Sequence, residues 1–222
     1  MEDLKTREPF KCRYQTAPKE ISKQTLPDGS HIKLSATTKV LVNYSETRRR
    51  IRLLNGEAQI STCKEVTWPF IVESRQALIR THKATFNIDQ RYGVTEVTVL
   101  EGNITVSPVK QNKNRAEIKK GEMLKVTEHN TGAIKGFEVS SYKDWGSGFT
   151  KADNIRLTEL LISLNRFTNT PLVTRDQNTS RLLVSGVYDL NHIEDTVLCL
   201  SKSYNLKVTK EESHTVLELL PE

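Results

Sequence analysis

The chain has 222 residues, a net charge of +6, 36% hydrophobic residues and 27% charged residues. This length supports a substantial core in one or two domains, and the composition is typical of a globular protein. No apolar run approaches the roughly 20 residues that cross a bilayer. The start, Met1–Lys5, lacks the basic flank and apolar stretch of a secretory signal. We therefore expect a globular fold with no membrane-spanning helix within these residues.

The positive charge is concentrated in the first part of the chain. Residues 141–222 carry nine Lys and Arg against eleven Asp and Glu, so their net charge is −2 and that of residues 1–140 is +8. On a strand, Arg48, Arg50 and Arg52 would share one face, and Arg49 would share the other with Ile51. This charge gives one candidate function, kept below as the alternative: the first part of the chain would be a basic β-rich module that binds carbohydrate or nucleic acid. Single charge runs are usually solvated and no aromatic platform accompanies this one, so we expect a solvated outer face and no nucleic-acid partner.

Short alternating strands fill the first part of the chain. Between Tyr14 and about Val139, apolar and polar residues alternate in short segments separated by Gly-containing turns, as in strands with one buried face. No segment there has a 3.6-residue period, so the pattern predicts an all-β sandwich, barrel or β-roll. The expected strands contain Ile32/Leu34, Val40/Val42/Tyr44, Ile51/Leu53, Ala58/Ile60, Phe70/Val72, Phe86/Ile88, Val97/Val99, Ile104/Val106, Leu124/Val126 and Phe137/Val139.

An aliphatic-x-x-Gly phrase recurs next to the alternating runs. Its copies end at Gly29, Gly56, Gly102 and Gly121, and the clearest separates two strands within residues 95–107. Since glycine tolerates a positive φ, we expect these four residues to be structural turns with that backbone conformation. Their uneven spacing indicates a recurring corner and not a strict solenoid repeat.

The pattern changes around Asp144–Gly148, where two glycines flank a short polar step. A leucine-rich helix is expected over 157–167, with Asp153 or Asn154 as its N-cap, and a second helix is expected after Asn191. With strands near residues 149, 172–173, 182–187, 206–208 and 216–219, the order is β-α-β followed by β-α-β-β. The predicted fold class is thus mainly β plus α+β. We divide the chain into a loose segment 1–13, an all-β domain 14–143 and a small α+β domain 144–222.

No motif supports catalysis or a cofactor. The chain contains no Walker, G-x-S-x-G or G-x-G-x-x-G sequence. No local motif places a nucleophile beside any of the five histidines, His31, His82, His129, His192 and His214. The three cysteines, Cys12, Cys63 and Cys199, lack zinc-ligand spacing. The sequence does not decide whether Cys12 and Cys63 form a disulfide in an oxidising compartment. We therefore expect no enzyme, no cofactor and no metal site.

Five motifs occur in order along the chain: Leu26-Pro27-Asp28-Gly29-Ser30, Arg49-Arg50-x-x-Leu53-x-x-Gly56-Glu57-Ala58, Pro69-Phe70-x-Val72, Val97-x-Val99-Leu100-Glu101-Gly102-x-Ile104-x-Val106 and Gly121-Glu122. Together they resemble the periplasmic part of FecR-family sigma regulators, the transmembrane anti-sigma proteins of bacterial cell-surface signalling. The resemblance runs from about Tyr14 to the end. Through Val184–Tyr188 and the leucine-rich helix, the second domain is similar to the short N-terminal domain of secretins and TonB-dependent receptors.

The resemblance implies a place in the periplasm, after a cytoplasmic anti-sigma segment and one membrane helix. This sequence contains neither, as expected if it begins just past the membrane helix. The implied partner is the periplasmic signalling domain of a TonB-dependent outer-membrane transporter for a siderophore or metal chelate. Proteolysis by periplasmic and intramembrane proteases and control of a cytoplasmic extracytoplasmic-function sigma factor, through the segment absent here, would follow.

The expected partner-binding stretch is Leu182, Leu183, Val184, Ser185, Gly186, Val187 and Tyr188. A small domain with few strands leaves an edge with unpaired backbone groups, to which a partner strand can be added. The stretch is apolar and free of Pro, and we expect Tyr188 to be exposed. A core strand without a partner role is the alternative interpretation, because alternating aliphatic residues normally face a core.

One family motif is altered in this chain. Family members usually have Leu-Gly-Thr-x-Phe in the β domain, and some cut themselves between the Gly and the Thr. The corresponding residues are Lys83 and Ala84, so both the hydroxyl nucleophile and the permissive glycine are missing. We therefore predict that this chain does not cleave itself.

Overall fold

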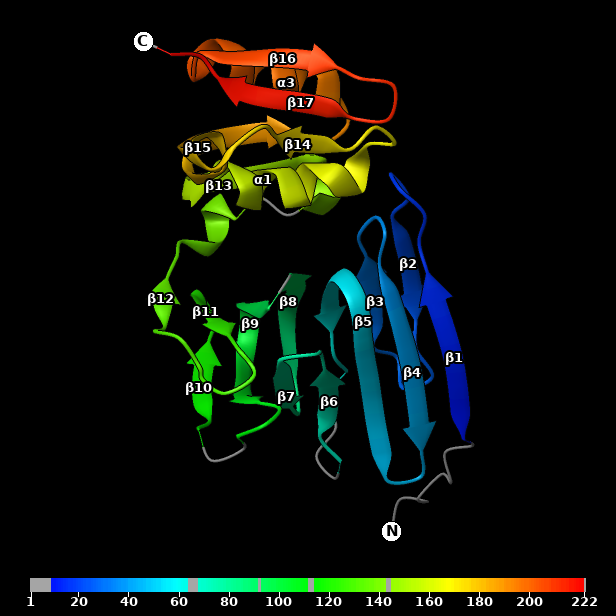
Figure 1. Ribbon diagram of the computed structural model, residues 1–222. Helices are drawn as coiled ribbons and strands as arrows, with labels where there is room; N and C mark the ends of the chain where they lie inside the picture. The colour runs from blue at the N-terminus through cyan, green and yellow to red at the C-terminus, as the bar shows by residue number, and fades with distance from the viewer. Residues whose placement is uncertain (1–8, 64–67, 92, 112–113, 143–144, 222) are drawn as a thin grey trace. The chain divides into compact units, whose positions relative to one another are not determined.

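The computed structural model describes residues 9–63, 68–91, 93–111, 114–142 and 145–221 (Figure 1). The chain divides into two compact units, the first formed by Met1–Ala17 with Ile21–Ser141 and the second by Pro18–Glu20 with Tyr142–Glu222. The division after residue 141 lies two residues before the predicted one, and Asp144 of the predicted junction lies outside the described residues.

The first unit is made of strands. They are β1 Phe10–Gln15, β2 Ser22–Thr25, β3 His31–Leu34, β4 Lys39–Ser45, β5 Arg48–Ser61, β6 Phe70–Glu73, β7 Ala77–Thr81, β8 Ala84–Arg91, β9 Val94–Pro108, β10 Ala116–Lys119, β11 Glu122–Val126 and β12 Lys135–Gly136. Nearly all pairs are antiparallel, the exception being the parallel pair of β5 with β6. The predicted mainly β class is confirmed for this unit.

The strands form two connected sheets, and β5 and β9 belong to both. The first half of β5 pairs with β4, up to Asn55, and the second half pairs with β8 from Gly56 onward. Likewise β9 pairs with β8 as far as Gly102 and with β10 from Asn103 onward. Each strand therefore passes from one sheet to the other at its glycine, where φ is +90° and +76° respectively.

The aliphatic residues of both sheets form one core. Buried side chains from β3, β5, β8 and β11 on one side and from β4, β6, β7 and β10 on the other belong to a single cluster. The alternation along each strand explains this, because every second side chain of a strand points to the same face. Of the predicted inward residues, Ile51, Ile60, Phe86 and Val97 are fully buried, whereas Phe137 and Val139 are only half-buried.

Several predicted boundaries in the first unit are wrong. The runs on either side of Gly56 and of Gly102 are single long strands, because the glycine bends the strand without ending its pairing. Phe137/Val139 is not a strand, since Val139–Ser141 is a 3-10 helix. The segment 1–13, expected to be loose, contains the start of β1, while its residues 1–8 lie outside the described residues.

The described residues of the second unit form three α-helices, two 3-10 helices and two small sheets. Its elements are the 3-10 helix Trp145–Ser147, β13 Phe149–Arg156, α1 Leu157–Leu164, the 3-10 helix Asn165–Phe167, β14 Leu172–Thr174, α2 Gln177–Arg181, β15 Leu183–Asp189, α3 Ile193–Ser203, β16 Leu206–Lys210 and β17 Thr215–Leu219. β13 pairs with β15, and β17 lies between β14 and β16 (Figure 1). The α+β class predicted for this part is confirmed.

The helix starts of the second unit differ from the prediction. α1 has Arg156 as its N-cap without a side-chain hydrogen bond, because Asp153 and Asn154 lie within β13. α3 begins after His192, one residue later than Asn191 would give. The sequence interpretation missed α2, although Asp176 is its N-cap and accepts hydrogen bonds from the N–H groups of the next turn.

Candidate functional site

A buried arginine connects two of the sequence motifs in the first unit. Arg49 is on the inner face of β5 with 0% of its surface exposed, and its guanidinium donates to the Asp28 carboxylate at 3.0 Å. It also donates to the carbonyl oxygens of Cys63 and Trp68, at 3.2 and 2.7 Å, and lies over the Phe70 ring at 5.4 Å. The buried charge is thus paired and hydrogen-bonded, as burial of a charge requires.

The Asp28 carboxylate also accepts hydrogen bonds from its own turn and from β4. Ser30 donates to the carboxylate through its backbone N–H, at 3.1 Å, and through its hydroxyl, at 2.8 Å. The Tyr44 hydroxyl donates to it at 3.2 Å. Gly29, at φ +80°, allows the turn. This arrangement accounts for the Leu26–Ser30 motif as a structural anchor for β5.

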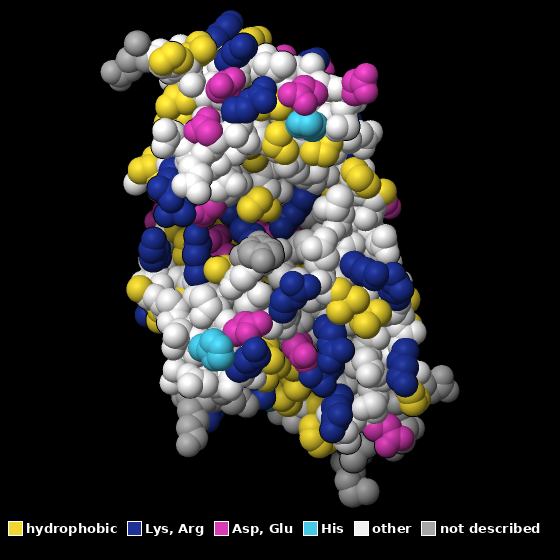
Figure 2. All heavy atoms as spheres, in the orientation of Figure 1, with side chains coloured by type: hydrophobic (Ala, Val, Ile, Leu, Met, Phe, Trp, Pro, Cys, Tyr) yellow, Lys and Arg dark blue, Asp and Glu magenta, His cyan; other side chains and the backbone are white. Residues whose placement is uncertain are grey.

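The remaining arginines of the run face outward, as predicted. Arg50 and Arg52 both form ion pairs with Glu73 of β6, so part of their charge is neutralised locally. Figure 2 shows Lys and Arg side chains interspersed with Asp, Glu and uncharged side chains on the viewed face of the first unit. The interpretation as a solvated face applies to three of the four arginines, and it missed the anchoring role of Arg49.

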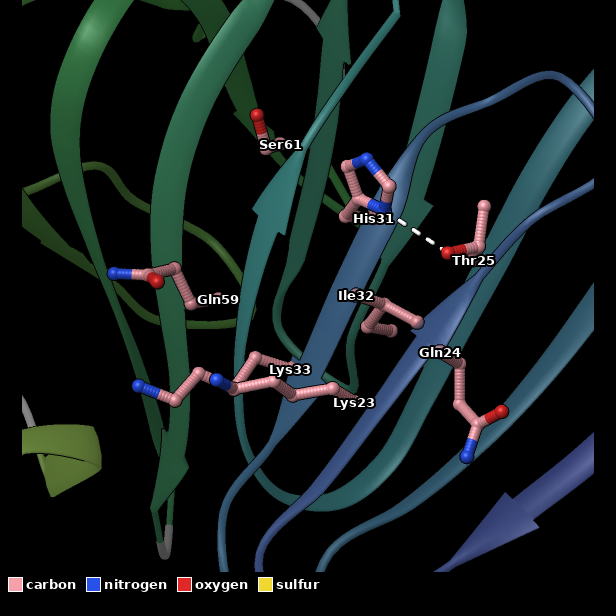
Figure 3. Close-up of a pocket in the computed structure, with 8 residues that line it drawn as sticks. All are labelled: Lys23, Gln24, Thr25, His31, Ile32, Lys33, Gln59 and Ser61. Carbon is pink, nitrogen blue, oxygen red and sulfur yellow. Dashed lines mark hydrogen bonds between the residues drawn. The ribbon is translucent and has the colours of Figure 1, made fainter.

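A shallow pocket of about 300 Å³ lies on β2, β3 and β5 (Figure 3). Lys23 and Lys33 are cross-strand partners there, and their side chains extend in the same direction. His31 hydrogen-bonds to Thr25 at 3.1 Å. The complete lining is Lys23, Gln24, Thr25, His31, Ile32, Lys33, Gln59 and Ser61. Ammonium, hydroxyl and amide groups of this kind suit an anionic or polyhydroxyl ligand.

In the second unit, β15 has one edge without a strand partner among the described residues, because β13 is its only neighbour there. Leu190 donates its N–H to the Gly148 carbonyl, and the Leu182 carbonyl accepts from Leu157. These even-numbered positions point toward β13, so the N–H and C=O groups of the odd-numbered positions point to the opposite edge. Leu183, Ser185 and Val187 therefore present their backbone groups at that edge.

A tyrosine hydroxyl occupies the middle of this edge. Tyr204, the C-cap of α3, accepts a hydrogen bond from the Ser185 N–H at 2.8 Å and donates one to the Ser185 carbonyl at 3.1 Å. Tyr188 also donates to this carbonyl at 3.1 Å. Burial raises the pKa of Tyr188, and its hydrogen bond with Tyr204 raises that pKa further. The Tyr188 hydroxyl is therefore neutral at physiological pH.

The side chains of the predicted partner-binding stretch fall into two groups. Leu183 and Val187 are 52% and 56% exposed, and Ser185 and Gly186 are exposed between them. Val184 is fully buried, and Tyr188 is only 5% exposed. The expected exposure of Tyr188 is wrong, because its ring lies against Gly186, where a Cβ would meet the ring at 3.2 Å. Leu182 is half-buried and precedes the strand.

Lys83 and Ala84 lie where β7 leads into β8. The Ala84 N–H donates to the Thr62 hydroxyl at 2.9 Å, and that hydroxyl lies 3.2 Å from the Ala84 carbonyl. The Thr85 hydroxyl is 3.1 Å from the Ser61 hydroxyl across the strand pair. Ala84 offers no hydroxyl to attack the Lys83 carbonyl.

The histidines and cysteines do not form a shared centre. His192 lies 2.9 Å from Asp189, and His214 lies 3.2 Å from Glu211. Among the described residues, no group of His, Cys, Asp and Glu has the arrangement of a metal site. Cys12, Cys63 and Cys199 are free thiols. Within the same residues, no helix has both the length and the apolar character needed to span a bilayer.

Comparison with known protein families gives a match for most of the first unit. Residues 12–105 match the family described as FecR protein, which covers most of the two-sheet unit. Over these residues the match confirms the FecR resemblance predicted from the sequence.

The fold is shared with solved structures over nearly the whole chain. Two crystal structures described as a "putative anti-sigma factor" from Parabacteroides distasonis ATCC 8503 are each 22% identical to it. They cover 96% and 95% of this chain and 100% of their own, with TM-scores of 0.84 and 0.83. No curated protein sequence matches the chain.

Proposed function

We propose that this chain is the periplasmic signalling region of an anti-sigma regulator. In this role the second unit binds the signalling domain of a TonB-dependent outer-membrane transporter and relays its occupancy by a siderophore or metal chelate. The signal passes through proteolysis and a cytoplasmic segment to an extracytoplasmic-function sigma factor. The FecR match and the fold shared with an anti-sigma factor structure support a signalling regulator, and no enzyme activity belongs to this role.

The observation that carries the docking part of the proposal is the edge of β15. Its odd-numbered backbone groups point away from β13, and the side chains of Leu183 and Val187 are more than half exposed beside them. A partner strand added to this edge would gain main-chain hydrogen bonds and cover these side chains. The second unit of about 80 residues has the few-stranded sheets that make such an edge available.

The test is binding of the intact chain to a purified transporter signalling domain, measured by calorimetry. Ser185→Pro removes a backbone N–H from the edge and should weaken binding at least about tenfold, since interfaces tolerate few lost central contacts. Ser185→Ala is the matched control, because it loses only the side-chain hydrogen bond from the Asn154 N–H and keeps the backbone. Unchanged affinity in a folded Ser185→Pro protein would contradict the docking site.

The pocket with Lys23 and Lys33 supports a second candidate, a module that binds an anionic carbohydrate. Its test is binding to heparin in physiological salt, with DNA as the comparison. Lys23→Gln should reduce heparin binding, while Lys202→Gln on α3 serves as a control of equal charge change. Retained heparin binding in Lys23→Gln would argue against the pocket, and equal loss in both variants would indicate nonspecific charge attraction.

A further inference from the structure

The β15 edge is closed at its centre in this chain. The Tyr204 hydroxyl both accepts from the Ser185 N–H and donates to the Ser185 carbonyl. A neighbouring β-strand would make the same pair of hydrogen bonds with a residue at this position. Tyr204 thus satisfies the two backbone groups that a partner strand needs.

The positions on either side differ from Ser185. Leu183 and Val187 have the same backbone orientation, and no hydrogen bond from Tyr204 reaches them in the described residues. Their side chains are exposed apolar surface on the face that Ser185 shares. Within the part of the chain that the structure describes, the edge therefore has two flanking positions with neither a strand partner nor a Tyr204 contact, and one central position occupied by Tyr204.

We infer that a partner strand binds β15 by replacing the Tyr204 hydroxyl at Ser185, so that Tyr204 is a removable cover on the docking edge. This inference rests on the proposed function. The partner segment is extended, pairs its main chain with Leu183, Ser185 and Val187, and has apolar side chains on the face of Leu183 and Val187. A protein without such a strand leaves the cover in place, which limits unwanted edge-to-edge association.

The loss of the hydroxyl should open the edge without removing the strand. Tyr204→Phe keeps the ring and deletes both hydrogen bonds to Ser185. In the free protein we expect the Ser185 amide to exchange its hydrogen at least about tenfold faster, the equivalent of one lost hydrogen bond. Tyr188→Phe is the matched control, because Tyr188 contacts the Ser185 carbonyl and not its N–H. Its Ser185 amide should stay protected by Tyr204.

Binding supplies the second readout. Tyr204→Phe should bind the transporter signalling domain roughly 2- to 10-fold more tightly than the parent, because no intramolecular hydrogen bond has to be broken. In the complex, the Ser185 amide should be protected in both proteins. The role of Tyr204 as a cover would be overturned if the Ser185 amide exchanged at the same rate in the parent and in Tyr204→Phe. It would also be overturned if Tyr204→Phe bound the transporter signalling domain as weakly as Ser185→Pro does.

Failure of the proposed function has a different signature. If neither the parent nor Tyr204→Phe binds the transporter signalling domain, the proposed partner is wrong, and so is the displacement of Tyr204 by that partner. Amide exchange at Ser185 still decides whether Tyr204 shields the edge. If Tyr204→Phe instead forms concentration-dependent dimers in sedimentation, the strand that fits this edge comes from a second copy, which overturns the transporter as occupant.

Discussion

Arg49 and Asp28 lie 21 positions apart in the chain, yet their side chains form a fully buried ion pair. Apart from the Tyr44 hydroxyl on β4, which donates to Asp28, the polar contacts of this pair are made to turns and loops: the Ser30 turn, Cys63 and Trp68. Burial of a charge is unfavourable unless such partners compensate it. The pair therefore makes these loops and β5 depend on one another.

We expect Arg49→Met to lower the free energy of unfolding of the first unit by about 3–5 kcal/mol, because it leaves the Asp28 carboxylate buried without its cation. Urea denaturation measures this change. Arg52→Met on the same strand is the control and should change stability by less than about 0.5 kcal/mol, since Arg52 is exposed. Equal effects of the two substitutions would contradict an anchoring role for Arg49.

His192 makes a pH-dependent contact in the second unit. The hydrogen bond with Asp189 raises the pKa of His192 and lowers the pKa of Asp189, although the N-terminus of α3 by itself would disfavour a charged imidazole. The stabilisation from His192 is complete below the unfolded pKa of about 6.5 and is lost as pH rises through the higher folded pKa. That from Asp189 is present above about pH 3.9 and is lost as pH falls through its folded pKa.

NMR titration of the His192 ring should give a pKa above the ordinary value in the parent, and Asp189→Asn should lower it. Asp195→Asn, which removes a smaller electrostatic contribution, should lower the pKa less. A His192 pKa that is the same in Asp189→Asn and the parent would refute the contact.

At the scale of elements, the two strands shared by both sheets depend on glycine. At Gly56 a Cβ would lie 2.7 Å from the Thr38 Cα, and at Gly102 it would lie 2.5 Å from the Lys83 carbonyl oxygen. Both residues have positive φ, so a side chain there is strained in addition to being crowded. The sequence predicts the positive φ, but the close approach of the neighbouring chain comes from the fold.

Gly56→Val and Gly102→Val should each lower the melting temperature of the first unit, with at least about 1–3 kcal/mol lost to backbone strain alone. Gly93→Val is the control, because Gly93 has φ +73° but nothing within 4 Å of an added Cβ. It should lose less stability than either of the other two. A Gly102→Val protein that melts with the parent would show that the bend in β9 does not need glycine.

Near these bends, threonine hydroxyls form hydrogen bonds with backbone groups of neighbouring segments. The Thr38 hydroxyl accepts from the Glu57 N–H at 3.0 Å, the Thr62 hydroxyl accepts from the Ala84 N–H at 2.9 Å, and the Thr81 hydroxyl donates to the Asn103 carbonyl at 2.9 Å. In the period-2 pattern these threonines count only as polar residues. Their partners lie 19 to 22 positions away, so the sequence pattern could not reveal them.

The connection from β7 to β8 should remain intact. Ala84 lacks the hydroxyl that self-cleavage by acyl shift requires, and both of its backbone groups contact Thr62. Intact-mass spectrometry after long incubation should therefore find one species. Fragments split at Lys83–Ala84 or Ala84–Thr85 would refute the prediction. An Ala84→Thr protein tests whether the hydroxyl alone restores cleavage.

At the scale of the whole molecule, each compact unit contains one of the two tryptophans. Trp68 belongs to the first unit and Trp145, which is buried, to the second. Trp68→Phe and Trp145→Phe proteins thus report the unfolding of one unit each by fluorescence. The units have separate cores, which predicts that damage to one core stays within its unit.

Leu200→Ala, at a fully buried position of α3, should cost about 2–5 kcal/mol and shift the Trp145 transition only. Gly56→Val should shift the Trp68 transition only. If Leu200→Ala moved both transitions by the same amount, the two units would unfold as one cooperative body.

The sequence by itself determined the features that depend on neighbours along the chain. Alternation predicted the inward face of nearly every strand, helical spacing predicted α1 and α3, and the glycine phrases predicted positive φ. Residues 182–187 were predicted as a strand, and β15 covers Leu183–Asp189. These properties follow from backbone geometry with periods of two or 3.6 residues and need no knowledge of the rest of the fold.

The tertiary structure alone decided which distant groups meet. The passage of β5 and β9 between sheets, the burial of Arg49 against Asp28, and the position of Tyr204 at Ser185 all join residues that lie far apart in sequence. Packing of the Tyr188 ring against Gly186 likewise decided that this side chain is buried and not exposed. A hydrogen bond or a buried ion pair needs two partners at a fixed distance, and that distance exists only after the sheets and helices have packed.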